Sequence, residues 1–345
     1  MCPALPWNSA IRPLSARNLK GTLLSIPRAR KEPKHLGVMK RLLNVAIVAW
    51  ALALGSTVSA EDTLSYPKGN GLRIVSAGHS WVAPAMNTLG PIALAAGFDG
   101  HHLYTHIGSA SMGSARSIWA AEKGLDYPER PKDASRKSIL LPAIETGQWD
   151  VMTWGEYPWD KAEDYTNWID ACLKANPDMV FYVQDGWPYA QDGMTAPGQY
   201  DIEKFLERQK QLNAFVRRGV DALNIKYPAK VHVIPVGDGI CELLKLQLKN
   251  QLPWIKAVDS RNQPIPGIYK DGGHLDESSG LGWFEGYIYY ATLYRMSPEL
   301  IQGKLNVLNE ELDKVFRKVA WQVVTRHPLS GVTGKNDNGT EDTIK

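Results

Sequence analysis

The sequence predicts an α/β fold in which helices flank a doubly wound sheet of about five parallel strands. Short β-like runs alternate with helical stretches through residues 71–326, the pattern of parallel strands joined by crossover helices. The 345-residue chain is 44% hydrophobic and 22% charged, as packed globular proteins are. No internal repeat, heptad run or low-complexity tract stands out, so disorder, fibres and coiled coils are excluded.

The elements follow one another in regular alternation. Five runs are expected as strands: Leu72–Ala77, His102–Ile107, Asp150–Trp154, Met179–Val183 and Val231–Pro235. Helices are expected over Val82–Ala96, Ser111–Ala121, Lys161–Asn176, Ile202–Lys226, Gly239–Gln251, Gly280–Arg295 and Lys304–Arg326. Tyr127–Lys137 and Trp187–Gly198 are expected as surface loops, and the tail from Pro328 to Lys345 as a frayed end. One domain over residues 61–327 accommodates all of these elements.

The first sixty residues differ from the rest of the chain. From Met39, two basic residues precede the apolar run Leu42–Leu54, and Val58-Ser59-Ala60 supplies small residues, which is the layout of a secretory signal peptide. The run is shorter than the roughly 20 residues of a membrane span, although an uncleaved N-terminal anchor is the alternative. We expect residues 39–60 to be this signal, with cleavage near Ala60 and a secreted or periplasmic mature protein. Residues 1–38 are expected to be an over-extended start, or else an unusually long basic leader.

The charge of the chain is unevenly divided. Of 39 Lys and Arg residues nine precede residue 61, together with one of the 36 acids, so the formal charge of +3 becomes −5 for residues 61–345. A basic surface for nucleic acid is therefore not expected on the folded part. Beyond Cys2, only Cys172 and Cys241 are present; an oxidising compartment permits a disulfide between them, but the sequence does not establish one. No zinc-ligand spacing occurs, and we expect no cofactor.

Two short motifs carry candidate chemistry. Ser80 follows the first strand in the turn Gly78-His79-Ser80, so its hydroxyl is expected at the C-terminal edge of the sheet, with its N–H among the free donors of a helix start. A helix-capping serine would have the same local sequence. Near the other end, Asp271-Gly272-Gly273-His274 lets a loop fold back so that the carboxylate accepts from the imidazole Nδ1–H, leaving Nε2 as a base.

Together these motifs resemble the SGNH (GDSL-like) hydrolases, secreted or cytoplasmic esterases and acyl hydrolases with a flavodoxin-like sheet. The likeness covers residues 71–295 in order and spacing, although only the two end motifs are specific. It implies that Ser80 is the nucleophile, His274 the general base and then acid, and Asp271 the residue that orients His274. His79 stands where better-known members have Asp, as in subgroups with Asn or His there.

The resemblance also implies an oxyanion hole. Gly108 or Ser109, after the second strand, would donate a backbone N–H beside that of Ser80. The family's Asn after the third strand is missing here, because Gly155-Glu156-Tyr157 occupies that place; a backbone N–H near Gly155 could substitute, or the hole could have two donors. In a flavodoxin-like strand order the first three strands end side by side at the ligand-binding switch point, where these loops converge.

Aromatic residues near these loops indicate the substrate. Trp81, Trp154 and Trp187 lie close in sequence to the loops of the expected site, and an indole suits stacking on a sugar ring or packing on an acyl chain. A buried core position is the alternative for each of them. Acidic residues also lie near strand ends, where they could serve glycoside cleavage or hold a metal, or remain solvated loop residues: Glu156, Asp160, Asp185 and Asp238.

The sequence therefore predicts a secreted serine esterase that hydrolyses an acyl ester, on a carbohydrate, through Ser80, His274 and Asp271. The expected partner is a small-molecule or glycan ester, with no nucleic acid and no stable membrane insertion after signal cleavage. The alternative is a catalytically weak protein of the same fold that binds glycans through its Trp surfaces. Hydrolysis of a sulfate or phosphate ester is a third alternative, for which activity would need metal or resist serine reagents.

Overall fold

A parallel five-stranded sheet forms the centre of the fold, as predicted. The computed structural model describes residues 70–108, 110–125, 140–158, 160–196, 199–256 and 267–334. The sheet order is β2-β1-β3-β4-β7, with every neighbouring pair parallel. Its strands are β1 (Arg73–Gly78), β2 (His102–Ile107), β3 (Val151–Gly155), β4 (Val180–Gln184) and β7 (Val231–Ile234). This order puts the ends of β2, β1 and β3 side by side, at the switch point of a flavodoxin-like sheet.

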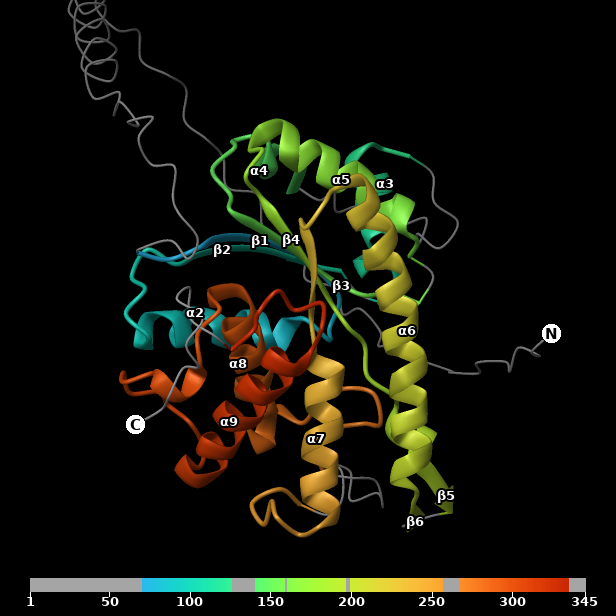
Figure 1. The fold of residues 1–345 in the computed structure, drawn as a ribbon, viewed down its shortest axis with the longest axis vertical. Coiled ribbons are helices and arrows are strands. Elements are labelled where there is room, and N and C mark those ends of the chain that lie inside the picture. Colours follow the sequence, from blue (N-terminus) through green and yellow to red (C-terminus); the bar gives the residue numbers. More distant parts are fainter. Residues whose placement is uncertain are drawn as a thin grey trace, which may run out of the picture. The chain divides into compact units, whose positions relative to one another are not determined.

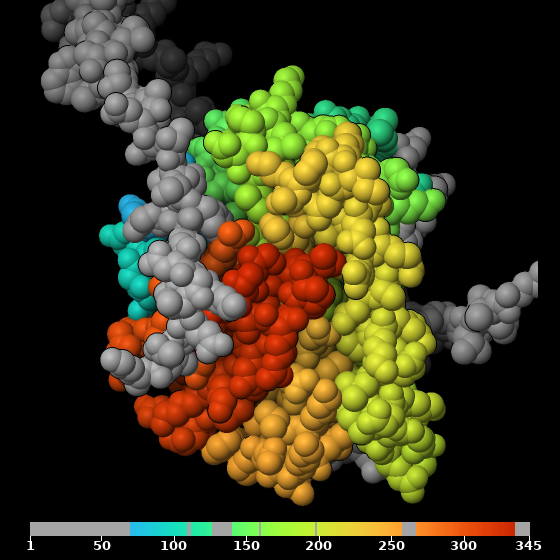
Figure 2. All heavy atoms as spheres, in the orientation of Figure 1, coloured from blue at the N-terminus to red at the C-terminus, as the bar shows by residue number. Residues whose placement is uncertain are grey.

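Helices cover both faces of the sheet (Figure 1). One face packs against α3 (Ala115–Glu122), α4 (Leu140–Ile144), α5 (Ala162–Ala175) and α6 (Ile202–Lys226). The other packs against α2 (Ala83–Ala95), α7 (Val236–Leu248), α8 (Leu281–Tyr294) and α9 (Glu310–Arg326). Figure 2 shows the side on which α6, α7 and α9 lie next to one another. Within the described ranges, no helix is both long and apolar enough to span a membrane.

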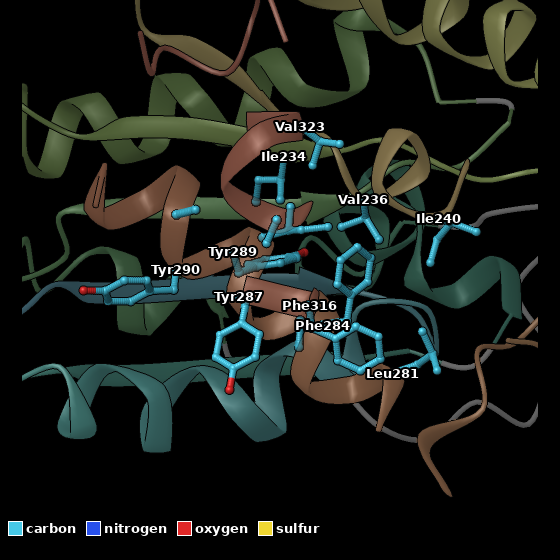
Figure 3. Packing of buried hydrophobic residues seen from close by; sticks show 14 of the residues in the cluster. Ile234, Val236, Ile240, Leu281, Phe284, Tyr287, Tyr289, Tyr290, Phe316 and Val323 are labelled. Atoms are coloured by element: carbon cyan, nitrogen blue, oxygen red, sulfur yellow. The ribbon is translucent and has the colours of Figure 1, made fainter. Parts of the chain in front are cut away.

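The strands are apolar on both sides because both faces of the sheet are buried. In β1, Ile74 points into the core on the α2 and α8 side, whereas Val75 points into the core on the α3 and α5 side. Figure 3 shows the first core, where side chains of β7, α7, α8 and α9 meet. In α8, every residue except Trp283 is buried. The sheet is thereby fixed as a rigid platform for the loops at its C-terminal edge.

Helices α2 and α8 pack closely against each other. Thr88 of α2 donates its hydroxyl hydrogen bond to the Gly282 carbonyl of α8, with an oxygen–oxygen distance of 2.8 Å. A Cβ at Gly286 would lie only 2.3 Å from the Thr88 hydroxyl oxygen, so glycine is needed for this approach. Because α2 follows Ser80 and α8 follows His274, this contact brings together the two distant segments that carry the predicted site.

Several local expectations need correction. The expected loop Trp187–Gly198 contains a 3₁₀ turn, Ala190–Gly193, and strand β5 (Met194–Ala196), which pairs with β6 (Gln199–Tyr200). α9 begins at Glu310 rather than Lys304, because the Asn309 side chain accepts a hydrogen bond from Leu312 N–H and caps the helix. The expected helix from Ser111 begins at Ala115, after a 3₁₀ turn.

The C-terminal tail was predicted to fray from residue 328, and this is wrong for residues 328–334. Val233 of β7 donates its N–H to the Leu329 carbonyl at 2.8 Å, and Ser330 is fully buried. The edge strand of the sheet therefore gains an extra partner from the tail. The proposed signal peptide, residues 39–60, and the preceding segment lie outside the described residues, as do Tyr127–Lys137.

Cys172 and Cys241 are both buried and free. Cys172 belongs to the core on the α5 side of the sheet and Cys241 to the core on the α7 side. The sheet separates the two thiols, so the disulfide that the sequence left open is absent from this structure.

Candidate active site

Ser80 and His274 form a direct hydrogen bond, although 194 residues separate them in sequence. The Ser80 Oγ lies 2.8 Å from the His274 Nε2. Ser80 sits in the turn after β1 and is exposed, and His274 lies in the loop before α8. The packing of α2 against α8 brings these loops together. The structure thus places the predicted nucleophile within proton-transfer distance of the predicted base.

Asp271 completes a three-residue chain of hydrogen bonds. Its two carboxylate oxygens lie 3.0 and 3.1 Å from the His274 Nδ1. Because a carboxylate only accepts, Nδ1 carries the proton, and Nε2 is left to accept from the Ser80 hydroxyl. Burial alone would raise the pKa of Asp271, but the N–H groups of His274 and Gly273 and the imidazole hold this pKa below its ordinary value. The arrangement orients the imidazole for removal of a proton from Ser80.

The loop that holds Asp271 and His274 is a tight hairpin. Lys270 donates its N–H to the His274 carbonyl at 2.8 Å, and Tyr269 and Leu275 form an antiparallel bridge. Gly272 has φ +88°, a left-handed conformation that glycine adopts without strain. The two glycines therefore allow the carboxylate to fold back onto the imidazole.

The segment after β4 fixes this loop from outside. The indole N–H of Trp187 donates to the Gly273 carbonyl at 2.9 Å, and the Ala190 N–H donates to the Gly272 carbonyl at 2.7 Å. The Tyr189 ring lies so close to Gly273 that a Cβ there would be 2.9 Å from it. Three residues of an expected surface loop thus hold the Asp271–His274 turn in place.

His79 has a structural role beside Ser80. Its Nε2 donates to the Glu156 carbonyl at 2.9 Å, and its Nδ1 accepts the Trp81 N–H at 3.4 Å. Burial lowers the pKa of His79, which agrees with a neutral ring that donates from one nitrogen and accepts at the other. The imidazole therefore ties the turn after β1 to the turn after β3. Sequence reasoning found no role for this residue.

The predicted oxyanion donors are only partly supported. The Gly108 N–H donates to the Gly78 carbonyl at 2.8 Å. In this conformation it cannot serve as the predicted oxyanion donor. Gly155 is buried, with the side chains of Val82 and His79 packed against its Cα, and is absent from the lining of the Ser80 cavity. Ser109 lies outside the described residues. The Ser80 N–H has no acceptor in the described ranges, so it remains available to an incoming oxygen.

The three Trp residues predicted to contact the substrate differ in their exposure and in whether they line the cavity. Trp154 is 1% exposed and packs between Tyr165 and Phe181 in the core, so it is wrong as a substrate contact. Strand alternation sends it to the α5 face of the sheet. Trp187 is 2% exposed and stacks on Trp81 with ring centroids 4.3 Å apart; it borders the cavity, but its N–H is already used. Trp81 is half-buried and lines the cavity next to Ser80.

Tyr189 is an exposed aromatic residue that the sequence did not single out. It is 48% exposed, and its ring meets the edge of Trp81 at a centroid distance of 5.6 Å. It belongs to the segment that covers the loop of His274. The Tyr189 ring is thus open to solvent at the rim of the site, whereas Trp154 and Trp187 are buried.

A cavity of about 300 Å³ opens beside the Ser80 hydroxyl. Its walls come from the turn before α2, the Trp187 segment, the hairpin loop and α8. It includes Ser80, Trp81, Asp271, His274, Glu277 and Glu285. Two other cavities of about 330 Å³ lie between α6, α7 and the end of α9, and neither contains a hydrogen-bonded serine and histidine. The site of interest is the cavity that holds Ser80.

Two of the acids near the strand ends, Asp160 and Asp185, are buried and accept hydrogen bonds from helix starts. The Asp160 carboxylate accepts the Ala115 N–H at the start of α3 at 2.9 Å, and Asp185 accepts the Gly237 N–H in α7 at 2.7 Å. Burial raises the pKa of Glu156 and of Asp160 to about 7. In the described part of the chain, no group of three or more potential ligands is arranged to hold a metal.

Comparisons with known proteins add little to this geometry. No family model matches the chain, and no curated protein matches it. Among solved structures, the chain is similar to a DUF4886 family protein from Bacteroides uniformis, at 12% sequence identity and a TM-score of 0.47. The match covers 74% of this chain and 95% of that one.

Proposed function

We propose that the protein is a serine hydrolase that cleaves a carboxylic ester, with Ser80 as nucleophile, His274 as base and Asp271 as the residue that orients His274. The observation that carries this proposal is the hydrogen-bonded chain from Ser80 Oγ to His274 Nε2 and from His274 Nδ1 to Asp271. A serine needs such a base, because its hydroxyl is a weak nucleophile at its ordinary pKa.

The reaction follows from the atoms present. Ser80 Oγ attacks the ester carbonyl carbon while its proton passes to His274 Nε2, and the resulting imidazolium is stabilised by Asp271. The Ser80 N–H donates to the oxygen on which negative charge develops. His274 then protonates the departing alcohol, and an acyl group remains on Ser80. A water molecule, deprotonated by His274, releases the acyl group as a carboxylic acid and restores the serine.

The substrate is proposed to be an acyl ester on a carbohydrate. Trp81 and Tyr189 supply aromatic surface within reach of Ser80, and both combine an apolar ring with a polar group. The Asp271 and His274 side chains are 39% and 44% exposed, so the site is open enough for a substrate that extends beyond the cavity. Sugar esters attached to larger glycans fit such an open site.

Labelling with a fluorophosphonate tests the proposal. The purified protein is expected to incorporate one label, located on Ser80 by mass spectrometry, and to hydrolyse p-nitrophenyl acetate. Ser80→Ala should abolish both, and His274→Gln should slow both by at least about a hundredfold, since general base catalysis contributes about 10²–10⁴. His327→Gln, at a histidine that lines another cavity, is the matched control and should change neither.

A glycan-binding protein without appreciable activity is the second candidate. The observation in its favour is that the Gly108 N–H is engaged by Gly78, which leaves the Ser80 N–H as the remaining predicted donor in the described ranges. Absence of labelling at Ser80, together with saturable binding of acetylated glycans, would establish this candidate and reject the hydrolase.

We also propose export of the protein through residues 39–60. The pattern of Lys40-Arg41, an apolar run and small residues up to Ala60 supports it. Expression in a bacterial host should give a periplasmic or extracellular protein whose N-terminus lies near Glu61. An intact N-terminus on membrane-bound protein would instead indicate the uncleaved anchor.

A further inference from the structure

Glu285 is a buried carboxyl group in the wall of the Ser80 cavity. It lies in α8, is 0% exposed, and borders the same cavity as Ser80, Trp81 and His274. Neither of its oxygens has a hydrogen-bond partner among the described residues. Burial of a polar group without a partner costs free energy in proteins, so this arrangement opposes folding.

The neighbouring polar groups of α8 are paired, which sets Glu285 apart. The Tyr289 hydroxyl donates to Gln184 at 2.7 Å, and the Tyr287 hydroxyl donates to Asp313 at 2.5 Å. Gln184 in turn donates to the Trp81 carbonyl at 3.2 Å. The other buried polar side chains of the helix therefore have hydrogen-bond partners within the protein. Glu285, beside the cavity, can take its partner from a bound ligand.

The surroundings of Glu285 favour an uncharged partner. Burial, and to a lesser degree the charge of Glu277, raise the pKa of Glu285 well above its ordinary value, which favours the protonated carboxyl. A protonated carboxyl offers one donor and one acceptor, which matches a hydroxyl group. An ammonium group would require Glu285 to ionise first, and it would meet the exposed carboxylates of Asp271 and Glu277 before reaching the cavity wall.

We infer that Glu285 is a substrate-binding residue and that it hydrogen-bonds a hydroxyl group of the ester substrate beside the acyl group held at Ser80. This inference rests on the proposed hydrolase function. A site that hydrogen-bonds a substrate hydroxyl can discriminate strongly against the analogue that lacks it, because its own buried polar group is then left unpaired. Glu285 thereby selects polyhydroxylated esters over simple aliphatic ones.

Two variants separate the chemical alternatives. Glu285→Gln keeps a donor and an acceptor but can carry no charge, and Glu285→Leu removes both. The substrates are monoacetylated methyl glycosides, deoxy analogues that each lack one ring hydroxyl, and amino-deoxy analogues in which an ammonium replaces it. p-Nitrophenyl acetate, which has no ring hydroxyl, is the reference substrate.

The wild-type protein should prefer the full glycoside over one deoxy analogue by at least about tenfold in kcat/KM. Glu285→Gln should keep that preference within about threefold, and Glu285→Leu should lose it, with kcat/KM for the full glycoside falling more than kcat/KM for p-nitrophenyl acetate. A Glu285→Leu protein that retains the preference overturns the inference. So does a preference for the ammonium analogue that disappears in Glu285→Gln, since that outcome assigns Glu285 to a cation.

Binding measurements keep this test separate from that of the hydrolase. Calorimetric titration of Ser80→Ala with the intact acetylated glycoside should show weaker binding, by about tenfold or more, when Glu285→Leu is added. If Ser80 fails to label in the wild type but this difference in binding is seen, the hydrolase fails and the role of Glu285 stands. Equal binding by the two Ser80→Ala proteins rejects the role of Glu285. If Glu285→Leu does not fold, the wild type alone decides: equal kcat/KM for the full glycoside and all the deoxy analogues rejects the role of Glu285.

Discussion

His79, the residue next to Ser80, shows how single side chains position the site. His79 bridges two turns through a neutral ring, with one nitrogen toward the Glu156 carbonyl and the other toward the Trp81 N–H. A carboxylate, which only accepts, could not donate to that carbonyl. The geometry accounts for an imidazole at this position without giving it a part in bond making.

Substitution of His79 should separate this positioning role from chemistry. In His79→Phe the Glu156 carbonyl loses its donor, which should lower the free energy of unfolding by about 1–3 kcal/mol. His79→Gln keeps an N–H near the position of Nε2 and should lose less than half as much. Urea unfolding of both variants measures the difference, and p-nitrophenyl acetate kinetics should rank them in the same order. Equal stability of the two variants would contradict the bridge.

At the scale of elements, the close contact of α2 and α8 brings together the loops of the site. Gly286 faces Thr88 where a methyl group would have no room. The contact joins elements far apart in sequence, and the loops that precede them carry Ser80 and His274. The distance between these two residues therefore depends on how the helices pack.

Gly286→Ala should push the helices apart. The added Cβ would lie 2.3 Å from the Thr88 hydroxyl and 2.8 Å from Ile92. Overpacking of this kind costs about 1–3 kcal/mol, and displacement of the catalytic groups should lower kcat about tenfold or more. Gly219→Ala in α6 is the matched control, because no atom beyond the adjoining backbone of its own helix lies within 4 Å of its added Cβ, and alanine favours a helix by about 0.5–1 kcal/mol. A Gly286→Ala protein as active and stable as Gly219→Ala would refute the argument.

The sequence predicted the sheet and its main helices because their signals are local. Strand β2 and helix α6 have the predicted bounds. Each of the other strands of the sheet begins and ends within one residue of its predicted bounds. The pairing of Ser80 with Asp271 and His274 followed from two short motifs. The support of that pairing by Trp187, Tyr189 and Ala190 could not be predicted, since it depends on contacts between distant segments.

For Trp154 and Glu285 the sequence held signals that the prediction did not use. Because both faces of this sheet are buried, a side chain within β3 lies in a core whichever face it takes, so the strand prediction itself could have assigned Trp154 to the core. For Glu285 a signal was present: it is the one charged residue in the apolar stretch 281–294. An acid in such a helix is costly unless something pairs with it, and that reasoning could have identified it.

For the molecule as a whole, buried acids make stability depend on pH. Glu156 and Asp160 have pKa values of about 7 in the folded protein, against ordinary values of 4.5 and 3.8. Between about pH 4 and 7 the folded chain therefore keeps protons that the unfolded chain releases. Stability from this source is fully present below the ordinary values and is lost as pH rises through 7.

Glu156→Gln should remove the part of the pH dependence of stability that Glu156 contributes. Relative to the wild type, the variant should gain stability as pH rises from 4.5 to 8, by an amount on the order of 2–3 kcal/mol at the upper end. Guanidinium unfolding at a series of pH values measures it. Glu145→Gln, at an exposed position, is the control and should track the wild type. A constant difference between Glu156→Gln and the wild type across this range would refute the assignment.

The 194-residue separation of Ser80 from His274 has a consequence for how the protein is made. A chain leaving the ribosome holds Ser80 early but lacks His274 until the later part of the chain has docked on the sheet. Closing so long a loop is among the slow steps of folding. The proposed ester hydrolysis should thus appear only with the last stage of folding, and a chain truncated before His274 should lack it.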